Sequence, residues 1–233
     1  ALNYAFNKDY TTKLLAGTST PSHGILPPGM LGHDPELRPY PHDPARARAL
    51  LAEAGHGAGL AIQYAVHGDE EALKIAASMQ ADLRAVGVTM DIAVMAFPTL
   101  YPLIQKDKGG APFTFMGWTA DYPDPRAFLD TKFHSRQISE DGGSMNDSFY
   151  ANPELDRLLD EAAVERDAPR RAALYRRAER ILYDDAPWIW NYHQVMTEVS
   201  QPYVRGYTLH PIWLRDFTTA WLDLGPDGEP VPR

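Results

Sequence analysis

The chain has 233 residues, 44% of them hydrophobic and 11% aromatic, which is enough apolar material for one large domain or two small ones. Acidic residues outnumber basic ones 31 to 22, and the formal charge of -9 disfavours binding to nucleic acid or to anionic membranes. Cysteine is absent, which excludes thiolate metal sites, iron–sulfur clusters, thiol nucleophiles and disulfides.

The first elements in the chain are a helix and a long loop. Residues 1–15 have the pattern of a helix with no capping residue before it, and the chain begins with Ala1 rather than Met. We therefore expect a fragment of a longer protein; a mature N-terminus left by processing is the alternative. Residues 17–44 are rich in Pro and Gly and predict an ordered loop without regular structure. Asp43 and Pro44 then begin a short predicted helix.

A strand, a helix and a second strand are predicted next. Residues 60–66 alternate between apolar and small or polar side chains, as in a strand, and so do residues 88–94. Between them, Asp69 is an N-cap for a helix with one apolar face, which Gly87 ends. This order predicts two parallel strands joined by a helical crossover.

The centre of the chain predicts one more strand and a short helix. Residues 113–118 are expected to form the strand, followed by a proline-rich turn at residues 121–125 and a helix around residues 127–133. Residues 135–150 are rich in Ser, Asp, Gly and Asn and predict a loop.

The last third predicts two helices, a strand and an irregular tail. The helices begin at Asn152 and Asp167 and are expected to pack against each other. Residues 188–195 predict a strand, and the tail from about Tyr207 has no clear period. With no internal repeat and no linker, the pattern indicates a single α/β domain.

The motifs of enzymes and of metal sites are missing. The eight histidines are scattered, none forms a His-Glu-x-x-His pair, and we expect no metal site. There is no Gly-x-Ser-x-Gly elbow, no phosphate-binding loop and no dinucleotide fingerprint, so we expect no catalytic residue and no cofactor. The adjacent acids Glu70–Glu71 and Asp184–Asp185 lie at helix ends, where a structural role is expected.

The most informative stretch runs from Gly117 to Pro125. A strand edge here could pair with the backbone of an extended ligand, and peptides are the obvious ligands for such an edge. Asp121, just beyond the strand, could hold the terminal ammonium of a peptide in a charge-assisted hydrogen bond. The alternative is that Asp121 is a turn residue and Trp118 belongs to the core; both interpretations remain open, whereas for Asp124 the turn is favoured.

The order and spacing of short motifs along most of the chain resemble the extracytoplasmic solute-binding proteins of peptide ABC importers. These motifs include the opening Ala-Leu-Asn-Tyr-Ala, Leu-Pro-Pro-Gly at 26–29, Asp43-Pro44 leading to Ala-Leu-Leu-Ala-Glu-Ala-Gly at 49–55, the helix end at 83–88, Gly117-Trp118 with Asp121 and Pro125, Tyr-Ala-Asn-Pro-Glu-Leu-Asp at 150–156, Arg171 to Tyr175, and Asp-Ala-Pro at 185–187. No single motif is diagnostic.

The resemblance implies a fold and a site. The fold would be the C-terminal lobe of a two-lobed periplasmic-binding-protein-like α/β fold, with a mixed sheet flanked by helices. Residues 1–206 would form the ligand-binding lobe, and residues 207–233 a tail that returns towards a first lobe absent here. Asp121 would hold the α-ammonium of the ligand, Gly117 and Thr119 would bond its backbone, and Trp118 would be a pocket wall. How the ligand carboxyl end is held is not indicated.

The resemblance also implies a function outside the cytoplasm. The chain would bind a short peptide or similar small solute and deliver it to the membrane subunits of an ABC importer, without catalysis. It would be periplasmic or extracytoplasmic, and lipid-anchored in some full-length forms. With one lobe, it is expected to bind ligand weakly or not at all. The alternatives are another cargo, such as a nickel chelate, haem, an oligosaccharide or an opine, an interaction or signalling module that has lost transport, and a hydrolase using Asp121 and His134.

Overall fold

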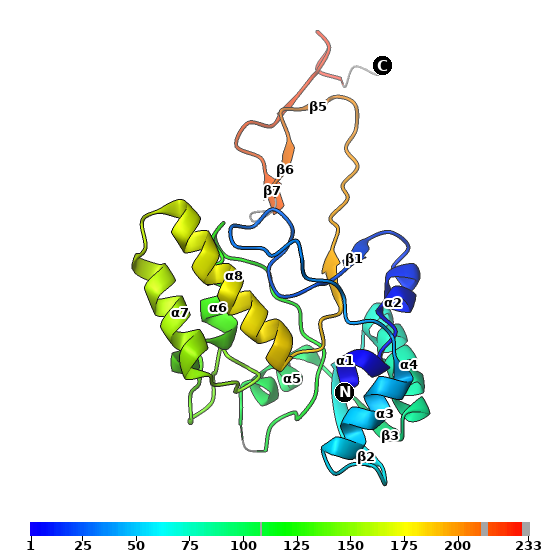
Figure 1. Ribbon diagram of the computed structural model, residues 1–233. Helices are drawn as coiled ribbons and strands as arrows, with labels where there is room; N and C mark the ends of the chain where they lie inside the picture. The colour runs from blue at the N-terminus through cyan, green and yellow to red at the C-terminus, as the bar shows by residue number, and fades with distance from the viewer. Residues whose placement is uncertain (108, 211–213, 230–233) are drawn as a thin grey trace.

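The chain packs around two hydrophobic clusters in the computed structural model, which describes residues 1–107, 109–210 and 214–229 (Figure 1). The first cluster is built from α1 (Leu2–Ala5), α3 (Pro44–Glu53), β2 (Leu60–His67), α4 (Glu70–Ala85) and β3 (Val88–Met95). The second is built from α6 (Arg126–Phe133), α7 (Pro153–Val164) and α8 (Ala168–Asp185). The α/β class predicted from the sequence is confirmed.

The predicted crossover is present in the first cluster. Strands β2 and β3 pair in parallel from Leu60 opposite Val88 to His67 opposite Met95, and α4 joins them. Asp69 caps α4 by accepting a hydrogen bond from the backbone N–H of Ala72 at 2.7 Å. The strands of the described residues pair two by two in four small sheets, so the sheet is smaller than expected.

The predicted opening helix is broken in two. After α1, a second helix, α2 (Lys8–Leu14), begins at Asn7, whose side chain accepts a hydrogen bond from the N–H of Tyr10. The N–H of Asn7 itself donates to the carboxylate of Asp82 on α4 at 2.9 Å. The break therefore arises because a capping residue inside the predicted helix also binds a distant element.

Two segments that are far apart in the sequence meet in a short sheet. Strand β1 (Ser19–Pro21) lies inside the predicted loop and pairs antiparallel with β4 (Tyr192–Gln194). The strand predicted over residues 188–195 is therefore present only in part. This pairing joins the start of the chain to its last third, and Tyr192 of β4 packs against the first cluster.

The two long helices of the second cluster are as predicted. Asn152 and Asp167 cap α7 and α8 with their side chains, and Leu155, Leu158 and Leu159 are buried between the helices. Helix α6 also lies where it was expected and is followed by the 3-10 turn η1 (Ser135–Gln137). The predicted loop over residues 135–150 is otherwise irregular.

One helix was not predicted. Helix α5 (Phe97–Ile104) contains Pro98 at its first turn and Pro102 in its interior, where proline normally breaks a helix. Its residues Leu100 and Ile104 are buried against Ala65 of β2 in a small third cluster. Tertiary packing therefore outweighs the local signal.

The tail extends away from the two clusters (Figure 1). In it β5 (Val204–Arg205) pairs with β8 (Trp221–Leu222), and β6 (Thr208–His210) pairs with β7 (Leu214–Asp216). Residues 211–213 and 230–233 of the predicted tail lie outside the described part, and the division at residue 207 stays a prediction. Within the described ranges, no helix has both the length and the apolar character needed to cross a membrane.

Candidate functional site

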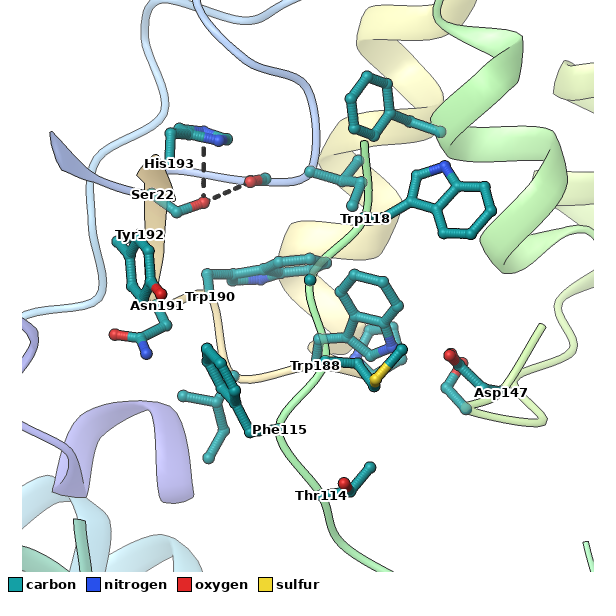
Figure 2. A pocket seen from close by; sticks show the side chains of 18 of the residues that line it. Ser22, Thr114, Phe115, Trp118, Asp147, Trp188, Trp190, Asn191, Tyr192 and His193 are labelled. Carbon is teal, nitrogen blue, oxygen red and sulfur yellow. Dashed lines mark hydrogen bonds between the residues drawn. The ribbon is translucent and has the colours of Figure 1, made fainter. Parts of the chain in front are cut away.

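A concave space of about 2040 Å³ lies between the two clusters, with residues of both in its wall. Most of the wall comes from three distant stretches of chain: residues 22–31, 111–120 and 183–194. Figure 2 shows side chains from all three stretches around this space. The volume exceeds the roughly 300–1,000 Å³ of ordinary small-molecule pockets, so this is a broad depression rather than a closed pocket.

The stretch that was predicted to be a strand, Phe113–Trp118, is not one. Thr114 makes one parallel bridge to Ala65 of β2, and the N–H of Ala65 donates a hydrogen bond to the carbonyl oxygen of Phe113 at 2.9 Å. Beyond this bridge, the main chain of residues 116–121 makes no hydrogen bond to any described residue. The alternating Phe113 and Phe115, which suggested a strand, instead pack on the first cluster. The peptide groups of residues 116–121 are thus free to bind an external partner.

Three of the predicted site residues lie together on this wall. Gly117, Trp118 and Thr119 all line the concave space, and Gly117 and Thr119 are exposed. A Cβ added to Gly117 would have no heavy atom within 4 Å apart from its chain neighbours, so another backbone can approach closely. Trp118 is half-buried, and its indole N–H donates to the carbonyl of Ala127 at 2.8 Å. An anchored ring therefore separates two open peptide groups.

Asp121 is not brought into the same wall. It is exposed, it is not among the residues that line the concave space, and no hydrogen bond or ion pair of its carboxylate is found within the described ranges. The carboxylate thus remains fully available at the edge of the depression. Its role in binding an ammonium group stays a prediction.

The neighbouring Asp124 has the structural role that was favoured for it. Its carboxylate accepts a hydrogen bond from the N–H of Arg126 at 3.0 Å, as expected of a turn residue. It also binds the guanidinium of Arg171 on α8 with two hydrogen bonds of 2.7 and 3.0 Å. This contact raises the pKa of Arg171 and joins the turn after the open segment to the second cluster.

Replacing Arg171 with methionine should lower the free energy of unfolding by about 2 kcal/mol. The change keeps an unbranched apolar side chain but leaves Asp124 and the carbonyl of Ala162 without the hydrogen bonds that Arg171 donates. Urea unfolding followed by circular dichroism measures the loss. Arg176→Met, an exposed position on the same helix, is the matched control and should change the stability by no more than about 0.5 kcal/mol.

The back of the depression is aromatic, with a few polar groups. The rings of Phe115 and Tyr192 stack with centroids 6.2 Å apart, and Trp190 is buried beside them (Figure 2). The amide of Asn191 and the indole N–H of Trp190 are buried and have no hydrogen-bond partner among the described residues. Apolar walls with a few polar groups are typical of sites for small ligands.

A serine and a histidine meet on the same wall, but they do not form a catalytic pair. The ring of His193 approaches the hydroxyl of Ser22 at 3.4 Å, and that hydroxyl donates to the carbonyl of Gly24 at 2.5 Å (Figure 2). Burial lowers the pKa of His193 to about 4, and no carboxylate partner of this ring is found in the described part of the chain. The hydroxyl proton thus points to a carbonyl rather than to a base, and no described residue is placed to activate Ser22 as a nucleophile.

Sequence reasoning missed the residue that holds one side of the depression in place. Glu179 of α8 is buried, and its carboxylate accepts hydrogen bonds from the N–H groups of Leu26 at 3.0 Å and Asp34 at 2.9 Å. A Cβ on Gly24 would lie 2.8 Å from the same carboxylate, so only glycine fits there without a shift. Burial raises the pKa of Glu179 to about 7.

No metal site is evident. Across residues 1–107, 109–210 and 214–229, no three His, Asp or Glu side chains are grouped so that they could hold a metal ion. The depression therefore offers peptide groups, aromatic faces and polar atoms as its binding chemistry, and charged side chains such as Asp147 also line it.

The sequence matches the family model of the bacterial extracellular solute-binding proteins, family 5 Middle, over residues 1–140. It is 29% identical over 230 residues to di/tripeptide-binding protein 2 of Pseudomonas aeruginosa, covering 96% of this chain and 42% of that protein. It is also 31% identical over 221 residues to heme-binding protein A of Haemophilus influenzae, covering 91% of this chain and 39% of that protein. The chain thus spans about two fifths of the length of these relatives.

The fold has solved counterparts. The periplasmic binding protein DppA of Helicobacter pylori, an ABC transporter-associated protein solved in complex with the peptide STSA, superposes with a TM-score of 0.80 at 27% sequence identity. The superposition covers 95% of this chain and 43% of that protein. The fold predicted from the sequence, part of a periplasmic-binding-protein fold, is confirmed.

Proposed function

Since this chain belongs to the family 5 bacterial extracellular solute-binding proteins, we propose that it binds a short peptide or similar small solute and delivers it to an ABC importer. The observation that supports this most directly is the open main chain of residues 116–120 on the wall of the concave space. A relative named for di/tripeptide binding and a structural neighbour solved with a bound peptide, each aligned with most of this chain, support the same ligand class.

The open segment suits the backbone of a peptide. An extended ligand pairs with unpaired N–H and C=O groups whatever its own side chains are, so affinity does not depend on one sequence. Gly117 leaves room for this approach, and the ring of Trp118 limits the space on one side. Gly117 and Thr119 are therefore the proposed main-chain contacts, and Trp118 is the proposed pocket wall.

Asp121 is the proposed partner of the α-ammonium of the ligand. In the described chain the carboxylate is exposed and lies outside the wall of the concave space, so burial of an ion pair there requires another surface. Closure of a second lobe over the ligand would supply that surface and would strengthen the pair by excluding water. The proposed partners are therefore a peptide, a first lobe and the membrane subunits of an importer.

The family is extracellular, and its members are solute-binding proteins rather than enzymes. We propose a periplasmic or cell-surface location for this protein, with a lipid anchor on the full-length protein in the cell-surface case. The engaged hydroxyl of Ser22 supports a function without catalysis.

Isothermal titration calorimetry with alanyl-phenylalanine and its N-acetylated form tests this function on the complete protein that carries this chain. We expect the free dipeptide to bind and the acetylated one to bind at least about 30-fold more weakly, because acetylation removes the ammonium group. The 233-residue chain alone should bind both forms weakly, because it presents half a site. Tight binding of the acetylated form would contradict the ammonium contact, and tight binding by the chain alone would contradict the two-lobed site.

A cargo other than a peptide is the second candidate, and the heme-binding relative is the observation that favours it. Native mass spectrometry of the complete protein as purified separates the two, because a retained peptide and a retained haem differ in mass and absorbance. A haem in the purified protein, with no binding of either dipeptide, would replace the peptide as the cargo.

A further inference from the structure

A buried lysine lies behind the Trp118 wall. Lys132 of α6 pairs with Asp147 of the following loop at 2.6 Å, and their side chains are only 5% and 7% exposed. Burial raises the pKa of Asp147, and the lysine beside it acts in the opposite direction. Buried ion pairs rarely stabilise a fold more than apolar residues of the same size would. Stability alone therefore does not account for this pair.

The ammonium group of Lys132 lies on two tryptophan rings. Its Nζ atom is 4.8 Å from the centroid of Trp118 and 5.9 Å from that of Trp188. In Figure 2 the rings of Trp118 and Trp188 lie on the same side of the 113–121 segment as the side chain of Asp147. A desolvated cation over an aromatic face is attractive, and tryptophan is the best ring for this contact. Trp118 is thus held at its edge by Ala127 and at its face by Lys132.

Such anchoring has a consequence for the open segment. Because the main chain of residues 116–121 makes no hydrogen bonds within the described structure, side chains must determine where it lies. Trp118 is the large side chain between Gly117 and Thr119, the two proposed main-chain contacts. Movement of its ring would therefore move both peptide groups.

We propose that Lys132 and Asp147 are positioning residues, which hold the ring of Trp118 and through it the peptide groups of Gly117 and Thr119 in place for the ligand. This proposal rests on the proposed peptide-binding function. Asp147 orients the ammonium group, and it also lines the concave space together with Ser148 and Phe149. The ion pair thus connects two parts of the wall, the open segment and the loop that follows η1.

The test is the double variant Lys132→Met/Asp147→Leu in the complete protein, titrated with alanyl-phenylalanine. The apolar pair should leave the midpoint of urea unfolding unchanged or raise it. The dissociation constant should nevertheless rise about tenfold, because the cation–ring contact is lost. The near-UV circular dichroism that depends on Trp118, obtained by subtracting the spectrum of Trp118→Phe, should decrease as the ring becomes mobile.

The control is Lys74→Met/Glu70→Gln on α4. It removes an exposed ion pair with the same nitrogen–oxygen distance, 2.6 Å, and should change none of these quantities. If Lys132→Met/Asp147→Leu does not fold, Lys132→Met/Asp147→Asn, which is closer in shape, is measured in the same way. A dissociation constant within twofold of the wild type would overturn the proposal. If the wild type binds no dipeptide, the peptide-binding function fails, and the Trp118 spectrum then decides: a changed spectrum supports the positioning role and an unchanged one overturns it.

Discussion

Replacing Asp121 with asparagine should weaken the binding of alanyl-phenylalanine to the complete protein by about 30- to 1,000-fold. The amide has the same shape as the carboxylate but no charge, so the ligand ammonium would be desolvated without a counter-ion. Folding should be nearly unaffected, because Asp121 is exposed and has no hydrogen bond or ion pair within the described residues. Its free energy of unfolding should change by no more than about 0.5 kcal/mol.

Calorimetry with the free and the N-acetylated dipeptide measures this effect. The acetylated form has no ammonium group, so its affinity should be the same for the variant and the wild type. Asp141→Asn, an exposed carboxylate in the loop after η1, is the matched control and should leave the affinity unchanged. If Asp121→Asn instead unfolds the protein, the turn interpretation is correct; if the free dipeptide binds as before, another group holds its amino end.

The parts of the fold that could be predicted are those with local signals at both ends. Asp43 and Pro44 begin α3, and the Asp69 cap and Gly87, which has a φ of +85°, bound α4. The parallel pairing of β2 with β3 then follows from the short crossover between them. Here chain geometry alone limits the possible arrangements.

The errors occur where distant contacts decide the structure. Pro102 argues against a helix, yet burial of Leu100 and Ile104 on Ala65 forms α5. The alternating pattern of residues 113–118 indicates a strand, but an alternating pattern gives only the side-chain directions. It does not say whether a neighbouring strand is present to complete the ladder.

The candidate site also has a part that could be predicted from the sequence and a part that could not. The position of Gly117, Trp118 and Thr119 on a concave wall could be predicted, because the motif itself carries the resemblance. The groups behind that wall could not. Lys132 and Asp147 are separated by a loop, and in the sequence each looks like an ordinary surface charge. Similarly, an amphipathic pattern on α8 gives no reason to expect the buried residue to be Glu179.

Raising the pH from about 4.5 to 7.5 should destabilise the wild type relative to Glu179→Gln by on the order of 3 kcal/mol. Burial raises the pKa of Glu179 from its ordinary 4.5 to about 7, and this is the largest effect on the group. Asp34, which lies close to it, raises the pKa further, whereas Arg180 and the two N–H donors lower it. Between these two pKa values, the folded chain holds a proton that the unfolded chain has released. Stability is therefore lost as the pH rises through this window.

Urea unfolding of both proteins at intervals of pH measures the difference in the free energy of unfolding. The difference is required because His193 acts in the opposite direction: burial lowers its pKa to about 4, so its contribution to stability increases as the pH rises towards 6.5. Subtracting the free energy of unfolding of Glu179→Gln from that of the wild type removes the contributions of His193 and Asp147, because both proteins share them. The control variant His193→Gln should therefore lose stability more steeply than the wild type as the pH rises. A difference between the wild type and Glu179→Gln that does not depend on pH would mean that Glu179 stays ionised, with the N–H groups of Leu26 and Asp34 offsetting its burial.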